Sequence, residues 1–230
     1  MNKGLNNNSL KIIAIIAMVL DHVAHAFISL TSPFYYIFRI VGRITAPIMF
    51  FSLANGYKYT RNKVKYGLRL FSFALISQIP FSLFLENKVF LYDKYNIIFT
   101  LFLGFLCLCF LYNIKNIFLK ILGVLSCFIL SYFCEYGLFA IGLIVLFSLC
   151  ENDRLKMLFY SFMCVFYITM RFFVNTMNPI GFLRYMGLFL AIPLFNLYSG
   201  QRGKYNLKYF FYVFYPVQFL VLFFVKTFFM

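Results

Sequence analysis

Apolar segments, most of them about as long as a lipid bilayer is thick, follow one another along almost the whole chain. A membrane-spanning helix needs about 20 predominantly apolar residues. Charged and turn residues divide the chain into nine candidate segments, of which the sixth is the shortest. They cover residues 10–30, 33–56, 67–85, 96–113, 117–134, 137–150, 157–175, 181–198 and 209–229. The pattern predicts an all-α fold, a polytopic transmembrane helical bundle of about nine spans.

Composition excludes the other broad classes of protein. Hydrophobic residues make up 63% of the chain and charged residues only 12%, whereas a water-soluble domain is about 25% charged. A soluble enzyme, a disordered chain and a disulfide-rich secreted module are therefore excluded. The apolar runs are too long for the alternating strands of a membrane barrel. No linker or repeat separates the segments, so we predict one integral membrane domain over residues 1–230.

The chain carries 21 lysines and arginines against 6 acidic residues. In a soluble protein this excess would suggest a nucleic-acid partner, but in a membrane protein cations gather in cytoplasmic loops. We therefore predict a lipid bilayer and no nucleic acid as partner, in the cell (cytoplasmic) membrane, with the N-terminus in the cytoplasm and the C-terminus outside. The ends predicted to face the cytoplasm carry Lys3, Lys11, Lys58, Arg61, Lys63, Lys65, Lys115, Arg154, Lys156, Arg202, Lys204 and Lys208.

Metal-binding patterns are missing from the sequence. The six cysteines lie in or at the ends of apolar segments without paired CxxC spacing, which is typical of small packing residues. The two histidines lie on one segment, which disfavours a zinc site. No metal is predicted.

The first apolar segment contains three ionisable residues, Asp21, His22 and His25. Steps of three and four place His22 and His25 on one helical face with Lys11. His22 lies about 16 Å along the helix from Lys11. Because ionisable residues inside spans mark functional cavities, we predict that His22 is a catalytic base and that His25 contacts substrate. The alternative is that His22 only makes an interhelical hydrogen bond.

The second segment carries Arg39 and Arg43, four residues apart. An arginine inside a span should pair with a carboxylate or face water, and Asp21 is the natural partner of Arg43. Such a pair would fix the first helix against the second and orient His22. We predict catalytic roles for Asp21 and Arg43 and substrate binding by Arg39, with a purely structural pair as the alternative.

A cationic connection follows the second segment. The positive-inside rule explains most of its charge, but a cationic mouth also suits a polyphosphate ligand through charge-assisted hydrogen bonds. In the third segment Gln78 and Pro80 interrupt the apolar run, and a proline kink often borders a cavity. We predict that Gln78 contacts substrate. The cations predicted to bind phosphate are Lys58, Arg61, Lys65 and Arg69.

At these residues the chain resembles the TraX family, whose members are integral membrane proteins associated with acetylation of the pilin N-terminus in conjugative systems. The family is similar to broader membrane acyltransferases, in which a first-helix histidine serves an acyl-CoA-dependent reaction. The resemblance implies that His22 occupies this position. This chain has Glu135 where an aspartate is expected, and Gln218 where the family often has a histidine. The resembling stretches are Leu10 to Met18 with Asp21-His22, Gly42-Arg43 with Pro47, Gly56, Thr60-Arg61, Arg69-Leu70, Ser77 to Phe81, Tyr136-Gly137 and Phe214 to Pro216.

Residues and resemblance together predict an integral membrane acyltransferase. It would move an acetyl group from cytoplasmic acetyl-CoA to a hydroxyl or amine of a peptide, glycan or lipid-linked acceptor at or beyond the outer side of the membrane, with His22 as general base. The alternative is a transporter or exporter of an anionic solute, which would use the arginines inside the apolar segments. These arginines are Arg39, Arg43, Arg171 and Arg184.

Overall fold

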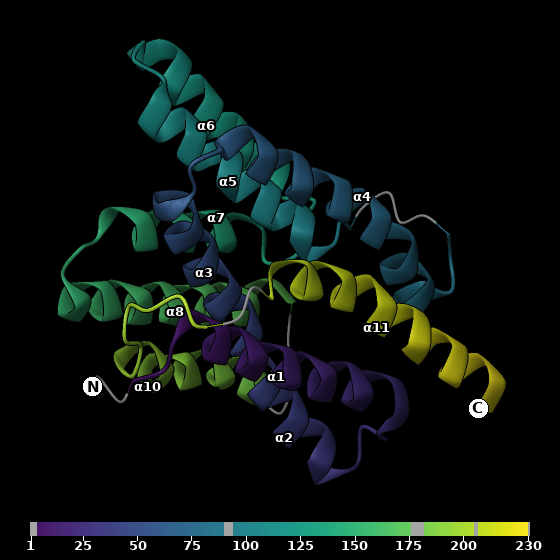
Figure 1. Ribbon diagram of the computed structural model, residues 1–230. Coiled ribbons are helices and arrows are strands. Elements are labelled where there is room, and N and C mark those ends of the chain that lie inside the picture. Colours follow the sequence, from purple (N-terminus) through teal and green to yellow (C-terminus); the bar gives the residue numbers. More distant parts are fainter. Residues whose placement is uncertain (1–3, 90–93, 176–181, 205–206, 230) are drawn as a thin grey trace. The chain divides into compact units, whose positions relative to one another are not determined.

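The computed structural model describes residues 4–89, 94–175, 182–204 and 207–229. Their regular structure is helical apart from two isolated bridges, which confirms the all-α prediction. The helices are α1 (Asn7–Phe27), α2 (Pro33–Gly42), α3 (Thr45–Tyr59), α4 (Lys63–Glu86), α5 (Ile97–Asn113), α6 (Ile117–Ser131), α7 (Gly137–Leu149), α8 (Asp153–Asn175), the 3-10 helix η1 (Arg184–Leu190), α10 (Ala191–Asn196) and α11 (Lys208–Phe229) (Figure 1).

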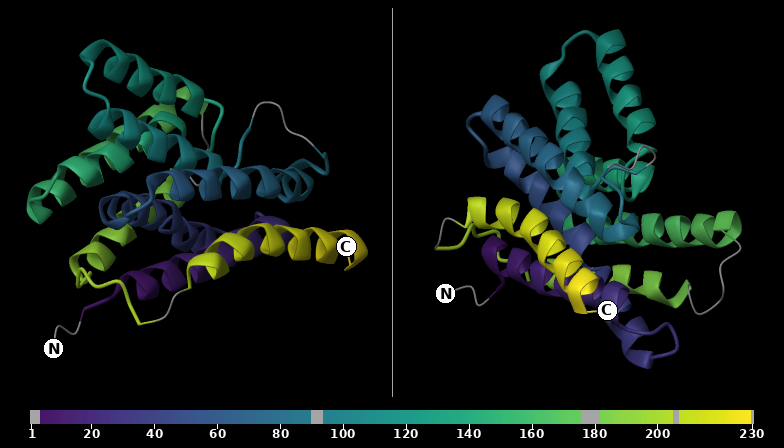
Figure 2. Two further views of the ribbon diagram at one scale, coloured as in Figure 1. Left: turned by 45° about the horizontal axis from the view of Figure 1, so that its top comes forward. Right: turned by 90° about the vertical axis from the view of Figure 1, so that its right-hand side faces the viewer.

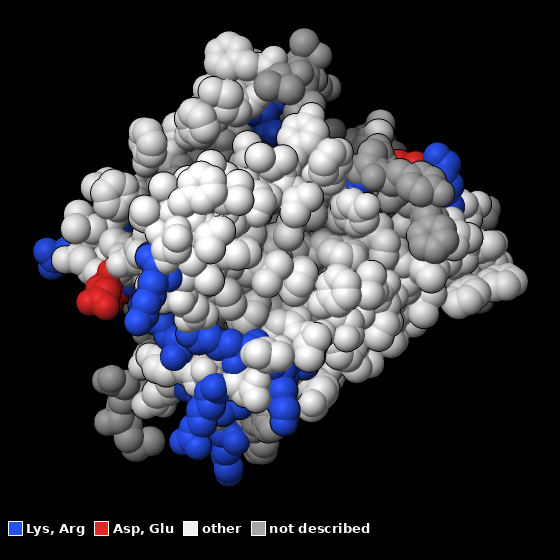
Figure 3. Space-filling model, turned by 90° about the horizontal axis from the view of Figure 1, so that it is seen from above, with Lys and Arg blue, Asp and Glu red and all other residues white. Residues whose placement is uncertain are grey.

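The helix lengths fit a multi-pass membrane protein, and the count of about nine spans stays a prediction. Three apolar helices, α5, α6 and α7, are short, with only 17, 15 and 13 residues. A helix of 13 residues is about 20 Å long, shorter than the hydrocarbon core of about 30 Å. The face drawn in Figure 3 is mostly uncharged, as expected of a surface in lipid. Among the described residues, five stretches are long and apolar enough to cross: Asn7–Phe27, Pro33–Tyr59, Lys63–Glu86, Asp153–Phe173 and Tyr209–Phe228.

The chain divides into two compact units, each built from separate stretches of sequence. The first unit consists of Met1–Met49, Asn152–Phe211 and Lys226–Met230, and the second of Phe50–Glu151 and Tyr212–Val225. The single-domain prediction stays a prediction.

In the first unit, α1 packs on α2, and η1 packs against α2, α8 and α10. The buried face of α1 includes Leu10, Ala14 and Met18, spaced by four residues as one helical face requires. The Asn6 side chain caps α1, since its Oδ1 accepts a hydrogen bond from the Ser9 amide at 3.0 Å.

In the second unit, α5 lies beside α4, α6 and α7 (Figures 1 and 2). Its core includes Leu103, Cys107, Cys127 and Ile141. The six cysteines, all among the described residues, are not joined in disulfides, and Cys107 and Cys127 are packed as small apolar residues. Asparagine side chains cap three of these helices: Asn62 caps α4, Asn96 caps α5 and Asn116 caps α6.

Within each unit, backbone contacts join connections that are distant in sequence. In the first unit Leu5 donates its amide hydrogen to the Leu197 carbonyl at 2.7 Å, and the Ser199 amide donates to the Leu5 carbonyl at 2.8 Å. In the second unit Tyr95 forms a parallel bridge with Cys134. Each contact joins two connections that the charge pattern assigns to the same side of the membrane.

In the second unit a side-chain contact joins another pair of chain ends that are predicted to lie on the same side of the membrane. The Lys63 ammonium donates hydrogen bonds to the Tyr57 hydroxyl at 3.1 Å and to Asn113 Oδ1 at 3.2 Å. It thereby joins the start of α4 to the end of α5, two ends that are both predicted to face the cytoplasm.

Candidate arginine site of the first unit

The predicted second helix is interrupted at Arg43 and Ile44, between α2 and α3. Pro47 is the third residue of α3 and has no amide hydrogen to donate to the Arg43 carbonyl. A proline is tolerated there because amides in the first turn of a helix have no partner within the helix. The Arg43 amide instead donates to the Ile40 carbonyl at 3.1 Å, which closes a tight turn. Arg43 therefore lies at a helix break rather than inside a continuous helix.

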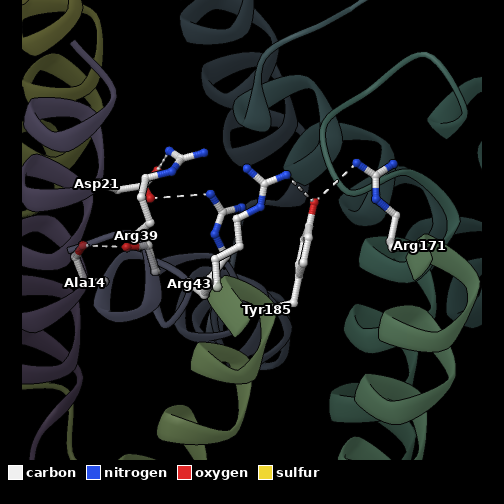
Figure 4. A network of polar contacts seen from close by, with 8 residues as sticks. Ala14, Asp21, Arg39, Arg43, Arg171 and Tyr185 are labelled. Atoms are coloured by element: carbon white, nitrogen blue, oxygen red, sulfur yellow. Dashed lines mark hydrogen bonds and ion pairs between the residues drawn. The ribbon is translucent and has the colours of Figure 1, made fainter. Parts of the chain in front are cut away.

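The structure joins Asp21 of α1 to both arginines of the second segment (Figure 4). Arg39 Nη1 lies 2.8 Å from Asp21 Oδ2, and Arg43 Nη2 lies 3.3 Å from Oδ1. The three side chains are only 12% to 13% exposed. The Asp21–Arg43 pair inferred from the sequence is thus present, and Arg39 shares the same carboxylate.

Glycine permits the close packing around this ion pair. A Cβ atom on Gly42 of α2 would collide with the Asp21 side chain. A Cβ on Gly187 of η1 would collide with the Ile40 carbonyl and come within 3.0 Å of Arg43 Cβ. Both α1 and η1 can therefore approach α2 at the level of the arginines.

Two further arginines reach the same place through Tyr185 of η1. The Tyr185 hydroxyl accepts hydrogen bonds from Arg171 at 3.3 Å and from Arg184 at 3.4 Å. Three guanidinium groups also lie over its ring: those of Arg43, Arg171 and Arg184, at 5.6, 5.9 and 5.0 Å from the centroid. Figure 4 shows Asp21, Arg39, Arg43, Tyr185 and Arg171 as one group of polar side chains. We call the four arginines with Asp21 and Tyr185 the arginine cluster.

His22 borders the arginine cluster. It is partly buried, and it interacts electrostatically with Asp21, Arg39 and Arg43. His25, one turn further along α1, is exposed. The structure thus brings His22 to the predicted neighbours Asp21 and Arg43, and the predicted substrate contact of His25 stays a prediction.

The four cations predicted to bind phosphate belong to the second unit and differ in their surroundings. Lys58, Arg61 and Lys65 are exposed around the connection between α3 and α4. Arg69 is partly buried, and its guanidinium lies between the rings of Tyr66 and Tyr212 at 5.1 and 5.2 Å. Three of the four are therefore accessible, whereas Arg69 packs against aromatic rings.

Gln78 lies in a buried hydrogen-bond network of the second unit. Its Oε1 accepts from the backbone amide and from Nδ2 of Asn96, at 3.1 and 2.9 Å. Its Nε2 donates to the Lys94 carbonyl at 3.0 Å and to the Ser82 hydroxyl at 3.3 Å. These bonds tie α4 to the start of α5. The predicted substrate contact of Gln78 stays a prediction.

Sequence reasoning noted Arg171 and Arg184 as arginines inside apolar segments but did not join them to Asp21, and it missed Tyr185. No local signal could have found this tyrosine, because it meets Arg171 only through the packing of η1 against α8. Its position next to Arg184 in an apolar segment was the one visible hint.

Comparison with known proteins gives the chain a family. It is 30% identical over 225 residues to the probable fimbrial assembly protein FimC, serogroup H1, of Dichelobacter nodosus, and the match covers 93% of this chain and 92% of that protein. No solved structure matches the chain. The family described as TraX protein matches residues 6–226, which is nearly the full length. The chain therefore belongs to the TraX family.

Proposed function

We propose that this protein is an integral membrane acetyltransferase that modifies a component of a surface appendage. The acetyl group would come from cytoplasmic acetyl-CoA and pass to a hydroxyl or amine of a peptide, glycan or lipid-linked acceptor. Family membership supports a membrane protein of the TraX type, and the name of the Dichelobacter nodosus relative supports a link to fimbrial assembly.

The observation that carries the proposal is the setting of His22. Its neighbour Asp21 is held by Arg39 and Arg43, at 2.8 and 3.3 Å. An imidazole accepts a proton only when it is neutral, and an unpaired carboxylate beside it would favour the charged form. Two arginines on Asp21 offset this effect and hold α1 in place, so His22 is suited to act as a general base.

In the proposed reaction His22 takes the proton of the acceptor hydroxyl or amine as that group attacks the thioester carbonyl. The carbon–sulfur bond then breaks, and the imidazolium returns the proton to the CoA thiolate that leaves. Arg43 would stabilise the oxyanion of the tetrahedral intermediate. A transient acyl-histidine is the alternative route.

The same site supports a second candidate function, a transporter or exporter of an anionic solute. The feature in its favour is the arginine cluster, in which Arg39 and Arg43 pair with Asp21, and Arg171 and Arg184 donate to the Tyr185 hydroxyl. A transporter would move a bound anion into proteoliposomes without releasing CoA, so the two functions give different results in one preparation.

The test is acetyl transfer by the purified protein in lipid nanodiscs, supplied with labelled acetyl-CoA and a membrane extract containing acceptors. General base catalysis contributes about 10²- to 10⁴-fold, so His22→Ala should lower the transfer rate at least about 100-fold. Ile16→Ala, on the exposed side of the same helix, is the matched control and should retain the wild-type rate. Near-normal transfer by correctly folded His22→Ala would refute the mechanism.

A further inference from the structure

We propose that the arginine cluster binds a phosphate ester or diphosphate group. No sequence prediction assigned a phosphate to this place, because the predicted phosphate site was the exposed set Lys58, Arg61, Lys65 and Arg69. The inference concerns binding alone and holds whether or not His22 is a catalytic base.

The first reason is the charge of the cluster. The cluster contains four guanidinium groups and one carboxylate, a net charge of +3 with Tyr185 as a neutral phenol. The first unit contains only two acidic residues in its sequence, Asp21 and Asp153. Asp153 is exposed and pairs with Lys156 at 2.8 Å. Within the first unit, Asp21 is therefore the acidic residue that pairs with the partly buried arginines of the cluster.

The second reason is the cost of leaving such a charge unbalanced. Partly buried like charges repel one another, and ionisable groups in apolar segments usually face a partner or a water-filled cavity. The guanidinium groups of Arg43, Arg171 and Arg184 all lie against the Tyr185 ring, at 5.6, 5.9 and 5.0 Å from its centroid, so like charges are held close together. A ligand with two or more negative charges relieves this repulsion, whereas a single carboxylate would balance only part of it.

The third reason is the geometry of the donors. Guanidinium groups present forked N–H donors that match phosphate oxygens, and arginine is favoured where planar recognition of phosphate is needed. Tyr185 holds Arg171 and Arg184 by one hydroxyl, so the two forks are fixed near each other. The Nε atoms of Arg39 and Arg184 are buried and have no hydrogen-bond partner among the described residues. Both are donors that phosphate oxygens could use.

The test uses inorganic pyrophosphate as probe, titrated into the purified full-length protein in nanodiscs of zwitterionic lipid. Hydrogen bonds to charged groups contribute enough that losing one should weaken binding about tenfold or more. Arg171→Gln and Arg184→Gln should each raise the dissociation constant by this factor. Arg154→Gln, an exposed arginine of the same helix as Arg171, is the matched control and should bind as the wild type does.

A lack of pyrophosphate binding by the wild-type protein would overturn the proposal, and so would equal binding by both glutamine variants. If the glutamine variants do not fold, Arg171→Lys and Arg184→Lys keep the charge but lose the forked donors. The lysine variants should then bind more weakly than wild type, and unchanged binding by both would also overturn the proposal.

Competition identifies the source of the phosphate. Displacement of pyrophosphate by CoA would assign the site to the soluble donor, and displacement by phosphatidic acid added to the nanodisc would assign it to a lipid headgroup. Either result supports the shared phosphate chemistry. His22→Ala separates this proposal from the proposed reaction, because it should lose acetyl transfer and keep pyrophosphate binding.

Discussion

At the scale of single residues, Asp21 of α1 holds together two arginines of the first unit. Its carboxylate pairs with both Arg39 and Arg43, and its own exposure is only 13%. Removing one partner of a buried ion pair leaves the other charges without compensation, which is worse than lacking the pair altogether. The residue that sequence reasoning paired with Arg43 therefore serves both stability and the setting of His22.

We expect Asp21→Asn to destabilise the folded protein by about 3 kcal/mol, because two partly buried arginines lose their counter-charge. Thermal unfolding of the protein in detergent, followed by size-exclusion chromatography, measures the change. Asp153→Asn is the matched control: its carboxylate is 89% exposed, and its loss should change stability by less than about 0.5 kcal/mol. Equal melting temperatures for both variants would contradict the structural role of Asp21.

A second prediction at this scale concerns the close packing of α1 on α2 at Gly42. A methyl group there collides with Asp21, so Gly42→Ala should push α1 away from α2 and cost about 1 to 3 kcal/mol. The control is Ile37→Ala on the exposed side of α2, which should cost far less. If Gly42→Ala melts at the wild-type temperature, the close approach of the two helices is wrong.

At the scale of elements, the sequence located the helices because long apolar runs and their breaks are visible without any tertiary information. It did not reveal the interruption at Arg43, since the apolar pattern continues through it, although Pro47 was a visible cause. The predicted span 181–198 is a 3-10 turn and a short helix in the described part of the chain. Gly187 and Pro193 in that segment both disfavour a regular helix.

The candidate site could be predicted only where the partners lie on consecutive helices or at the same predicted depth in the membrane. Asp21 and Arg43 met both conditions, because consecutive helices pack side by side. The contact of Arg171 with Tyr185 depends on how α8 meets η1, and hydrophobic patterning carries no information about that choice. The arginine cluster is therefore a result of tertiary packing.

Asn96 joins two elements of the second unit and allows a prediction at this scale. Its Oδ1 caps α5 by accepting from the Ile98 amide at 2.9 Å, and its Nδ2 donates to the Ala74 carbonyl of α4 at 2.8 Å. Asn96→Ala loses the cap and leaves buried groups of α4 without partners, so it should cost about 3 kcal/mol.

Asn116→Ala is the matched control for Asn96→Ala, because Asn116 caps α6 at an exposed position through the Leu119 amide alone. It should cost about 1 kcal/mol. Denaturant unfolding of both variants in the same micelle measures the difference. Equal losses would show that Asn96 acts only as a cap and does not tie α5 to α4.

At the scale of the whole molecule, contacts between connections restrict how often the chain can cross the membrane. Two connections that touch outside the bilayer lie on one side of it, so an even number of crossings separates them. The Lys63–Asn113 contact fits crossings by both α4 and α5, and the Tyr95–Cys134 bridge fits crossings by both α5 and α6. These restrictions follow from contacts within one unit.

The Leu5–Tyr198 bridge restricts in the same way the two least certain candidate spans, α7 and the η1–α10 segment. The first two apolar segments, α4 to α6 and α8 would give six crossings between Leu5 and Tyr198. The number of crossings between these residues stays even only if the two remaining segments behave alike. Either the 13-residue α7 and the η1–α10 segment both cross, or neither does. If these segments cross and the bridge lies outside the bilayer, we expect nine or seven crossings, with the two termini on opposite sides in both cases.

A reporter inserted after Asn152, between α7 and α8, decides between these totals. Arg154 and Lys156 follow directly, and cations favour the cytoplasmic side, so we expect this site to be cytoplasmic and the chain to cross nine times. Alkaline phosphatase should then be inactive, and green fluorescent protein fluorescent, after Asn152. A fusion after Tyr95, predicted to lie outside, should give the reverse pattern and serves as the control. Active phosphatase at both sites would mean that α7 and the η1–α10 segment stay within one leaflet, leaving seven crossings.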